Sequence, residues 1–210
     1  MSGENSITLG VEEELFLVDL ESRKILDNPN QKIFEACKTT SGPHKIVREF
    51  LRSQIETNTK VCSSIAELRE ALSETRKIVV EAAEQYGATA MAASTHPLAS
   101  LRDRAITEGE RYEDFAIVFQ EALRRFVVGG MHIHAGFGDA ETRIPVMTAL
   151  RRYLPLLHAL STSSPFTEGH DTGFKSYRLS LIGNLPRTGV PGALYSKSCL
   201  LYTSPSPRDS

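Results

Sequence analysis

The chain has 210 residues, of which 24 are Lys or Arg and 26 are Asp or Glu, so its formal net charge at pH 7 is −2. Because basic residues are not in surplus, we expect neither a nucleic-acid partner nor an anionic membrane surface. Apolar residues make up 40% of the sequence and charged residues 24%, which is typical of a globular domain and excludes a disordered chain.

Targeting and cysteine patterns also narrow the class of protein. The first residues, 1–5, lack the cationic and apolar regions of a secretory signal, which predicts a cytoplasmic location. No apolar stretch approaches the ~18 residues that a membrane-spanning helix needs. The three cysteines, Cys37, Cys62 and Cys199, are widely spaced and odd in number, so they predict reduced thiols and no disulfide framework or CxxC zinc site.

The first half of the chain alternates between extended and helical patterns. Residues 7–19 alternate in polarity, which predicts a strand, and residues 24–26 are expected to return beside it. A short helix is expected at 31–38 and a second extended region at 45–59. Ser64 and Glu67 form a capping box and Gly87 suits a helix end, which predicts a helix between them.

The second half continues with a small apolar segment at 88–93, which predicts a buried strand. Helices are expected at about 110–127 and 139–161, separated by a strand at 131–137, with a kink at Pro155. From residue 163 onward the sequence is rich in Gly, Pro, Ser and Thr and is expected to be mostly loop. Because strands and helices do not alternate strictly, the predicted class is α+β around an antiparallel sheet.

The last residues have no relation to the segment before them. Residues 198–210, SCLLYTSPSPRDS, show no hydropathy period and look like translated library-adapter sequence. We therefore treat residues 1–196 as one structural unit and 197–210 as a non-native tail. On this interpretation the natural protein continues beyond residue 196.

Two pairs of carboxylates are the first candidates for chemistry. Glu12 and Glu14 lie two residues apart in the first strand, so both project from the face opposite the apolar residues. Glu49 and Glu56 have an odd separation, and only a bulge or break near Arg52 would bring them together. Like charges on one face repel each other unless a positive group lies between them. For both pairs a solvent-exposed acidic strand is therefore an equally simple interpretation.

The segment GGMHIHAGF places His132 and His134 on one face of a predicted strand, with Met131, Ile133 and Ala135 expected to pack behind them. Two imidazoles beside several carboxylates suit a divalent cation. Because no thiolate lies nearby and carboxylates dominate, Mg²⁺ or Mn²⁺ is favoured over zinc. The alternative is a pair of hydrogen-bonded structural histidines.

Taken in order, the segments TLGVEEELFLVD, SQIETNTKVC, GGMHIHAGF, ALSTSSPFTEGHDTGFKSYR and LPRTGVP resemble the YbdK-type carboxylate–amine ligases, also called type 2 glutamate–cysteine ligases. The resemblance runs from about residue 7 to residue 195. It implies the N-terminal half of a glutamine-synthetase-like fold, in which an antiparallel sheet curves into a funnel backed by helices.

The resemblance also implies an activity, which is the ATP-dependent joining of the glutamate γ-carboxylate to the cysteine amine through an acyl phosphate. The products would be γ-glutamylcysteine, ADP and phosphate. The implied cofactors are ATP and Mg²⁺, with Mn²⁺ as a substitute, and the implied partners are small-molecule substrates, with a homodimer by analogy.

The roles that the resemblance implies fall on eleven residues. The metal ligands would be Glu12, Glu14, Glu49, Glu56 and His132. His134 would contact metal or phosphate. Arg178 would pair with a substrate carboxylate or a phosphate as a catalytic, nucleotide-binding and substrate-binding residue, because a guanidinium binds such groups bidentately. Asp171, Thr172 and Tyr177 would shape the substrate pocket, and Arg187 is a weaker candidate.

Two other classes of function stay open at this point. A metal-dependent amidohydrolase also uses an HxH strand, although it leaves the acidic first strand without a role. A non-catalytic module that binds nucleotide or amino acid is the other. Because the later strands of the implied fold lie outside this sequence, we expect the 210-residue chain itself to be inactive.

Overall fold

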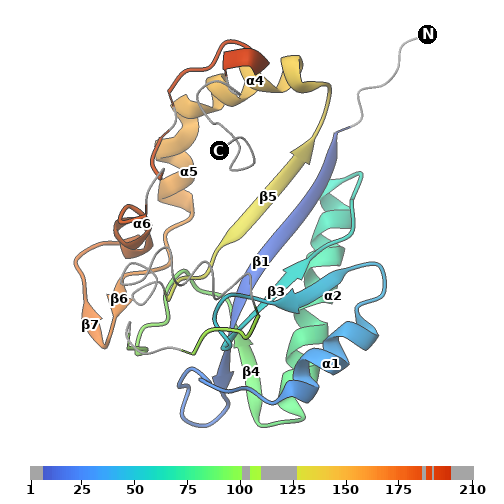
Figure 1. The fold of residues 1–210 in the computed structure, drawn as a ribbon, viewed down its shortest axis with the longest axis vertical. Coiled ribbons are helices and arrows are strands. Elements are labelled where there is room, and N and C mark those ends of the chain that lie inside the picture. Colours follow the sequence, from blue (N-terminus) through green and yellow to red (C-terminus); the bar gives the residue numbers. More distant parts are fainter. Residues whose placement is uncertain (1–6, 101–104, 110–126, 186–187, 191, 200–210) are drawn as a thin grey trace.

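A long central strand organises the fold in the computed structural model, which describes residues 7–100, 105–109, 127–185, 188–190 and 192–199. Strand β1 (Thr8–Asp19) pairs with β3 (Gln54–Asn58) along one edge, and β2 (Lys45–Arg48) extends the sheet beyond β3. Along the other edge β1 pairs first with β5 (Met131–Gly136) and then with β4 (Ala88–Met91) (Figure 1). Every pairing is antiparallel, which confirms the expected α+β class.

Helices α1 (Gln31–Thr40) and α2 (Ile65–Glu84) cover one face of this sheet (Figure 1). Because successive strand residues point to opposite faces, the odd-numbered residues of β1 face these helices. Leu15 and Leu17 are fully buried there with Ile33, Ile55 and Val79. This packing holds β1 in place, and the even-numbered residues therefore project from the opposite face.

The opposite face of β1 changes character along the strand. Toward its C-terminal end, Phe16 and Val18 lie in a second apolar core with Val127, Val128 and Leu181. Toward its N-terminal end the same face carries Glu12 and Glu14. The face of β1 opposite the helices is thus apolar at the C-terminal end of the strand and acidic at its N-terminal end.

Helix α2 has the ends that its sequence predicted. The Ser64 side chain accepts a hydrogen bond from the Glu67 N–H at 3.1 Å, and the φ angle of Gly87 is +70°, a conformation that favours glycine. The expected return of residues 24–26 is also present, as a bridge between Val18 and Ile25. The helix expected at 110–127 falls on residues outside the described ranges, apart from Val127.

The structure differs from the expected single helix at 139–161. Helix α4 (Ala140–Leu150) is followed by a 3₁₀ turn, η1 (Arg151–Tyr153), and by α5 (Leu154–Leu160). Pro155 lies at the start of α5, where a missing backbone N–H is tolerated, and the regular helix therefore breaks just before it.

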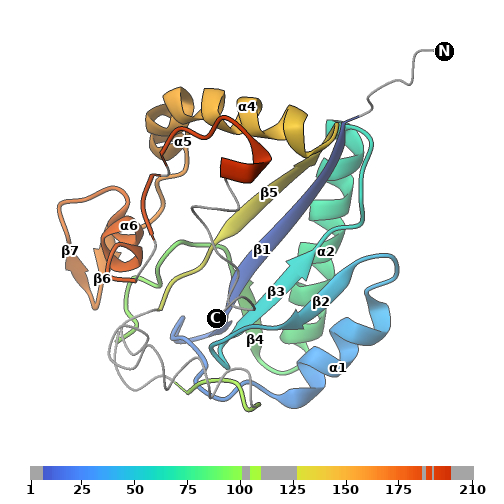
Figure 2. The ribbon, with the colours of Figure 1, turned by 45° about the horizontal axis from the view of Figure 1, so that its top comes forward.

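The described residues after 163 are mostly loop, as expected, and they contain three short elements: the hairpin strands β6 (Phe166–Thr167) and β7 (His170–Asp171) and helix α6 (Tyr177–Ile182). One further expectation is wrong. The apolar side chains of β5 do not pack behind its histidines, since Ile133 is 70% exposed. Helix α2 lies behind the other half of the sheet and leaves β5 bare (Figure 2).

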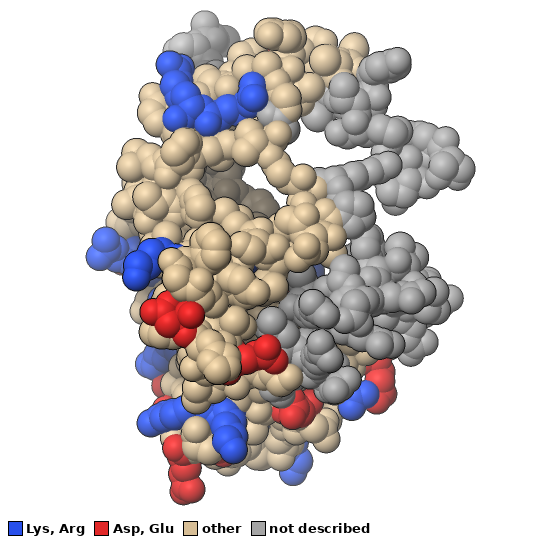
Figure 3. All heavy atoms as spheres, turned by 90° about the vertical axis from the view of Figure 1, so that its left-hand side faces the viewer, with Lys and Arg blue, Asp and Glu red and all other residues tan. Residues whose placement is uncertain are grey.

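Large apolar side chains are exposed on the helices beside β5. Neutral residues dominate the face on which α5 and α6 lie (Figure 3). The exposed apolar residues of α4, η1 and α5 are Val146, Leu150, Tyr153, Leu156, Leu157 and Leu160. Among the described helices, none is long and apolar enough to cross a membrane.

An ion pair between a buried carboxylate and a half-exposed guanidinium ties β1 to α2 next to the acidic face. Glu13 is only 3% exposed, and its carboxylate accepts two hydrogen bonds from the Arg76 guanidinium, one of them 2.8 Å from Nε to Oε2. A bidentate charged pair of this kind fixes both direction and distance. It therefore orients the strand segment that carries Glu12 and Glu14.

We expect Arg76→Met to lower the free energy of unfolding by about 2 kcal/mol, because it leaves the buried Glu13 carboxylate without its partner. Lys77→Met is the matched control, since Lys77 is exposed on the same helix and its ion pair with Glu81 is a surface pair of 3.7 Å. Urea denaturation of both variants measures the difference. Equal losses in the two variants would contradict a structural role for the pair.

Candidate functional site

Three neighbouring strands bring carboxylates and imidazoles to one face of the sheet. In the β1–β3 ladder Glu14 lies opposite Glu56 and Glu12 opposite Asn58, and in the β1–β5 ladder Glu12 lies opposite His132. Residues directly opposite in a ladder share a face, so these side chains project together. His134 lies two residues further along β5 on the same side, as the spacing of the two histidines predicted.

Glu12 lies between the two histidines. Its Oε2 atom is 3.1 Å from Nε2 of His134 and 3.5 Å from Nδ1 of His132. The Glu56 Oε1 atom accepts a hydrogen bond of 2.6 Å from Asn58 Nδ2. Glu12 thus has its polar neighbours on the adjoining strand β5, and Glu56 has its polar neighbour on its own strand β3.

Glu49 joins this group because the chain turns between β2 and β3. The two strands pair antiparallel, and residues 49–53 connect them, so the predicted break near Arg52 is present. Burial raises the pKa of Glu49 to about 7, with further contributions from the Glu14 charge and from a hydrogen bond to Glu56. A raised pKa means that the site disfavours one more negative charge.

Glu14 experiences the same environment. Burial raises its pKa, and the neighbouring Glu56 adds to that rise, while the Gly130 N–H, Arg178 and His132 oppose it. Three of the four predicted carboxylates therefore act on one another electrostatically, and the fourth, Glu12, lies next to Glu14 on the same strand face. The positive charge of nearby side chains does not fully compensate them.

The donor set has the chemistry of a hard-cation site, since oxygen ligands outnumber imidazoles and no thiolate is among them. Among the described residues, however, no group of three or more His, Cys, Asp and Glu side chains is arranged to hold a metal ion. The side chains of Glu12 and Glu56 are instead engaged with His134 and Asn58. The metal-ligand roles of these residues remain predictions.

Arg178 belongs to helix α6 and is the basic neighbour of Glu14 on the acidic face. Its backbone N–H donates to Ser164 Oγ at 3.1 Å, and its Nε atom is buried without a hydrogen-bond partner in the described structure. Burial lowers the pKa of its guanidinium and the Glu14 charge opposes that change. A buried guanidinium donor without a partner is the group that a carboxylate or phosphate would satisfy.

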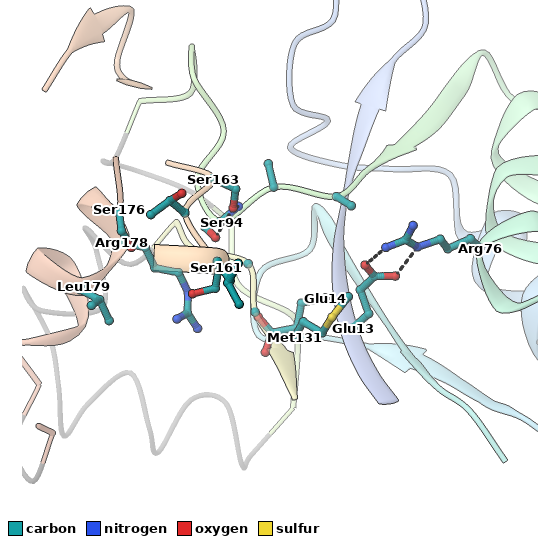
Figure 4. Close-up of a pocket in the computed structure, with 16 residues that line it drawn as sticks. Glu13, Glu14, Arg76, Ser94, Met131, Ser161, Ser163, Ser176, Arg178 and Leu179 are labelled. Carbon is teal, nitrogen blue, oxygen red and sulfur yellow. Dashed lines mark hydrogen bonds and ion pairs between the residues drawn. The ribbon is translucent and has the colours of Figure 1, made fainter. Parts of the chain in front are cut away.

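Arg178 and Glu14 both line a cavity of about 410 Å³ at the place where β4 ends and β5 begins (Figure 4). Serine and threonine hydroxyls line much of the rest, and Ser94 and Ser163 hydrogen-bond each other through their Oγ atoms at 2.6 Å. Met131, Leu160 and Leu179 provide apolar walls. Glu13 and Arg76, which pair with each other, also line the cavity, so it combines two carboxylates, two guanidinium groups, several hydroxyls and apolar walls.

The other predicted substrate residues do not line this cavity. Asp171 is exposed in β7, where its carboxylate accepts the Gly173 N–H at 2.9 Å. Thr172 donates from Oγ1 to the Pro165 carbonyl at 2.8 Å, and Tyr177 packs against the second apolar core. Their positions support a role in shaping the loop before α6. Arg187 lies outside the described residues.

Sequence reasoning missed Ser94, Ser163 and Gly130. The two serines are 69 residues apart and lie in loops, where no periodic pattern marks them. Gly130 precedes the HxH motif directly, and two consecutive glycines at that point were a signal of close backbone packing. Gly129 and Gly130 connect the strands here, through bonds from the Gly129 N–H to the Ser94 carbonyl and from the Glu14 N–H to the Gly130 carbonyl.

Comparison with known sequences now decides the family. The sequence profile described as "Glutamate-cysteine ligase family 2" matches residues 8–198. The chain belongs to this family. The resemblance found in its motifs is therefore confirmed.

The relatives that carry the name "Putative glutamate--cysteine ligase 2" include the following two. The relative from Rhodospirillum rubrum is 42% identical over 196 residues, which is 92% of this chain and 50% of the relative. The relative from Jannaschia sp. is 41% identical over 189 residues, or 90% of this chain and 50% of the relative. The chain thus spans about half the length of these glutamate–cysteine ligase family 2 relatives.

Solved structures support the fold. The chain resembles a bifunctional glutathione synthetase from Pasteurella multocida with a TM-score of 0.59 at 16% identity, covering 76% of this chain and 24% of that one. It also resembles a glutamate–cysteine ligase from Francisella tularensis in complex with AMP, with a TM-score of 0.54 at 14% identity, covering 75% and 34%.

We predict that Glu49 makes the free energy of unfolding depend on pH. Because its pKa is raised in the folded protein, its stabilising contribution is fully present below the ordinary pKa of 4.5 and is lost as the pH rises through about 7. We expect a loss of about 1 kcal/mol between pH 5 and pH 8, because the group is only half-buried. In Glu49→Gln this loss should shrink, as measured by urea denaturation at both pH values. An unchanged pH profile in the variant would refute the electrostatic interpretation.

Proposed function

We propose that this chain forms the metal-binding and substrate-carboxylate-binding half of an ATP-dependent ligase that joins the γ-carboxylate of glutamate to the amine of cysteine. The observation that carries the proposal is the juxtaposition of four carboxylates and two imidazoles with a half-buried guanidinium, whose buried Nε atom has no hydrogen-bond partner in the described structure. Membership of the glutamate–cysteine ligase family 2 supports the class of reaction.

The proposed chemistry requires opposite charges in one place. A carboxylate oxygen of glutamate attacks the γ-phosphorus of ATP, ADP leaves, and the product is an acyl phosphate. The cysteine amine then attacks the acyl carbon, phosphate leaves, and the amine gives up a proton. Two anions must approach each other in the first step, so neutralisation of their charge is the main task of the protein.

The described residues divide this task between two groups. Glu12, Glu14, Glu49, Glu56 and His132 are the proposed ligands for Mg²⁺, which would supply charge neutralisation at the triphosphate when bound. The guanidinium of Arg178 is proposed to hold a substrate carboxylate or a phosphate oxygen by bidentate hydrogen bonds. His134 is proposed to contact metal or phosphate beside Glu12.

The cavity beside Arg178 supports the assignment of an amino-acid substrate. Its volume of about 410 Å³ is within the usual range of small-molecule sites. Arg76 on its wall is already paired with Glu13, so the Arg178 guanidinium, the Glu14 carboxylate and the apolar walls are the groups that match the carboxylate, amine and short side chain of an amino acid. The amidohydrolase alternative is not favoured, because it assigns no role to these carboxylates and because the family is one of ligases.

Activity can be tested in a chimera that joins residues 8–196 of this chain to the part of the Rhodospirillum rubrum relative that the match leaves uncovered. We expect γ-glutamylcysteine and ADP to form from ATP, glutamate and cysteine, while the 210-residue chain alone stays inactive. Arg178→Met in the chimera should lower kcat/KM by on the order of 10²-fold. Zinc-dependent hydrolysis without ATP turnover would overturn the proposal.

Metal binding can be tested on the 210-residue chain without any turnover. We expect Mg²⁺ to raise the temperature of thermal unfolding at pH 8, because a cation relieves the repulsion among the carboxylates. Glu56→Gln should remove most of this response. Glu70→Gln is the matched control, since Glu70 is exposed on α2 and its loss changes the net charge equally. The same Mg²⁺ response in both variants would exclude the site.

A further inference from the structure

We infer that Gly130 is a positioning residue, whose missing side chain provides the space in which the Arg178 guanidinium lies beside Glu14. The inference deepens the proposed function, because it rests on the role that we propose for Arg178. It concerns a position to which neither the motifs nor the family resemblance assigned a task. Its basis is the close approach of two charged side chains to one Cα atom.

The geometry is specific to this glycine. A Cβ atom built on Gly130 would lie 3.0 Å from Arg178 Nη2 and 3.3 Å from Glu14 Oε2. The φ angle of Gly130 is not among the positive values that favour glycine, so its backbone conformation is open to any residue. Space, and not backbone conformation, is therefore the reason for a glycine at this position.

Arg178 is the group that an added methyl would displace. The Glu14 carboxylate is held by the central strand and by the Gly130 N–H. The Arg178 guanidinium is the far end of a long side chain, and its buried Nε atom has no hydrogen-bond partner in the described structure. A methyl at position 130 would therefore require the guanidinium to shift by a few tenths of an ångström from its place beside Glu14.

The neighbouring glycines behave differently and provide controls. A Cβ atom on Gly10, on the same sheet, would meet Thr59 Oγ1 at 3.8 Å and His134 Cβ at 3.9 Å, which are ordinary contacts. A Cβ atom on Gly129 would lie 2.5 Å from the Ala93 carbonyl oxygen, which is backbone and cannot move aside. Gly10→Ala is thus the neutral control, and Gly129→Ala is the variant with a purely structural defect.

The first test follows the guanidinium directly in the 210-residue chain, by correlation spectra of the arginine Nε–H groups labelled with ¹⁵N. The Arg178 signal is assigned by its loss in Arg178→Lys. We expect Gly130→Ala to shift this signal and to speed its exchange with water, while Gly10→Ala leaves it in place. An unchanged Arg178 signal in Gly130→Ala would overturn the inference, whatever reaction the protein catalyses.

The second test separates positioning from a structural defect in the active chimera. We expect Gly130→Ala to lower kcat/KM by on the order of 10²-fold, and to have no further effect in an Arg178→Met background. If Gly130→Ala fails to fold, the double variant should fold, because the displaced group is gone. A loss that is equal in both backgrounds, or a double variant that still fails to fold, would contradict the role. If the unaltered chimera is inactive, the proposed function fails while the spectra still decide the inference.

Discussion

The burial of neighbouring carboxylates on one face of a small sheet is the constraint on which the rest of this structure depends. Burial raises the pKa of Glu14 and of Glu49, and the charge of Glu56 adds to both shifts. Burying charged groups raises the free energy of the folded state, so favourable packing elsewhere must offset it. Here that packing is the apolar contact of β1 with α1 and α2, reinforced by the ion pair of the buried Glu13 with Arg76. The fold therefore holds the acidic face in place without a bound cation, and a cation is the ligand that we propose for it.

The interruption between β4 and β5 is the second feature that defines the site. Both strands pair with the same edge of β1, and between them Gly129 and Gly130 carry the chain past Glu14. A continuous strand would place a side chain there and close the space. The interruption opens a cavity instead, and helix α6 directs Arg178 into it from a distant part of the sequence (Figure 4). Glu14 and Arg178 thus lie together at the interruption between the two strands.

The exposed face of β5 and the apolar helices beside it have a simple relation to the length of the chain. Ile133 and the large side chains of α4 and α5 are open to solvent in this structure, and the chain spans about half the length of its family relatives. Large exposed apolar surface of this extent is unusual for an isolated domain. The acidic face and the Arg178 cavity are the parts of the proposed site that the described residues contain.

Local patterns in the sequence determined the central strand, the ends of α2, the antiparallel α+β class and the shared face of Glu12, Glu14, His132 and His134. These features depend on alternation or on capping within a few residues, so they can be read without a tertiary structure. The motifs, taken in order, were also sufficient to indicate the family. Only the tertiary structure decided that Glu49 reaches Glu56, that a helix carries Arg178 to Glu14, and that β5 is exposed. Each of these depends on contacts between residues far apart in the chain, where the turn that joins two strands, or the absence of a covering helix, determines the outcome.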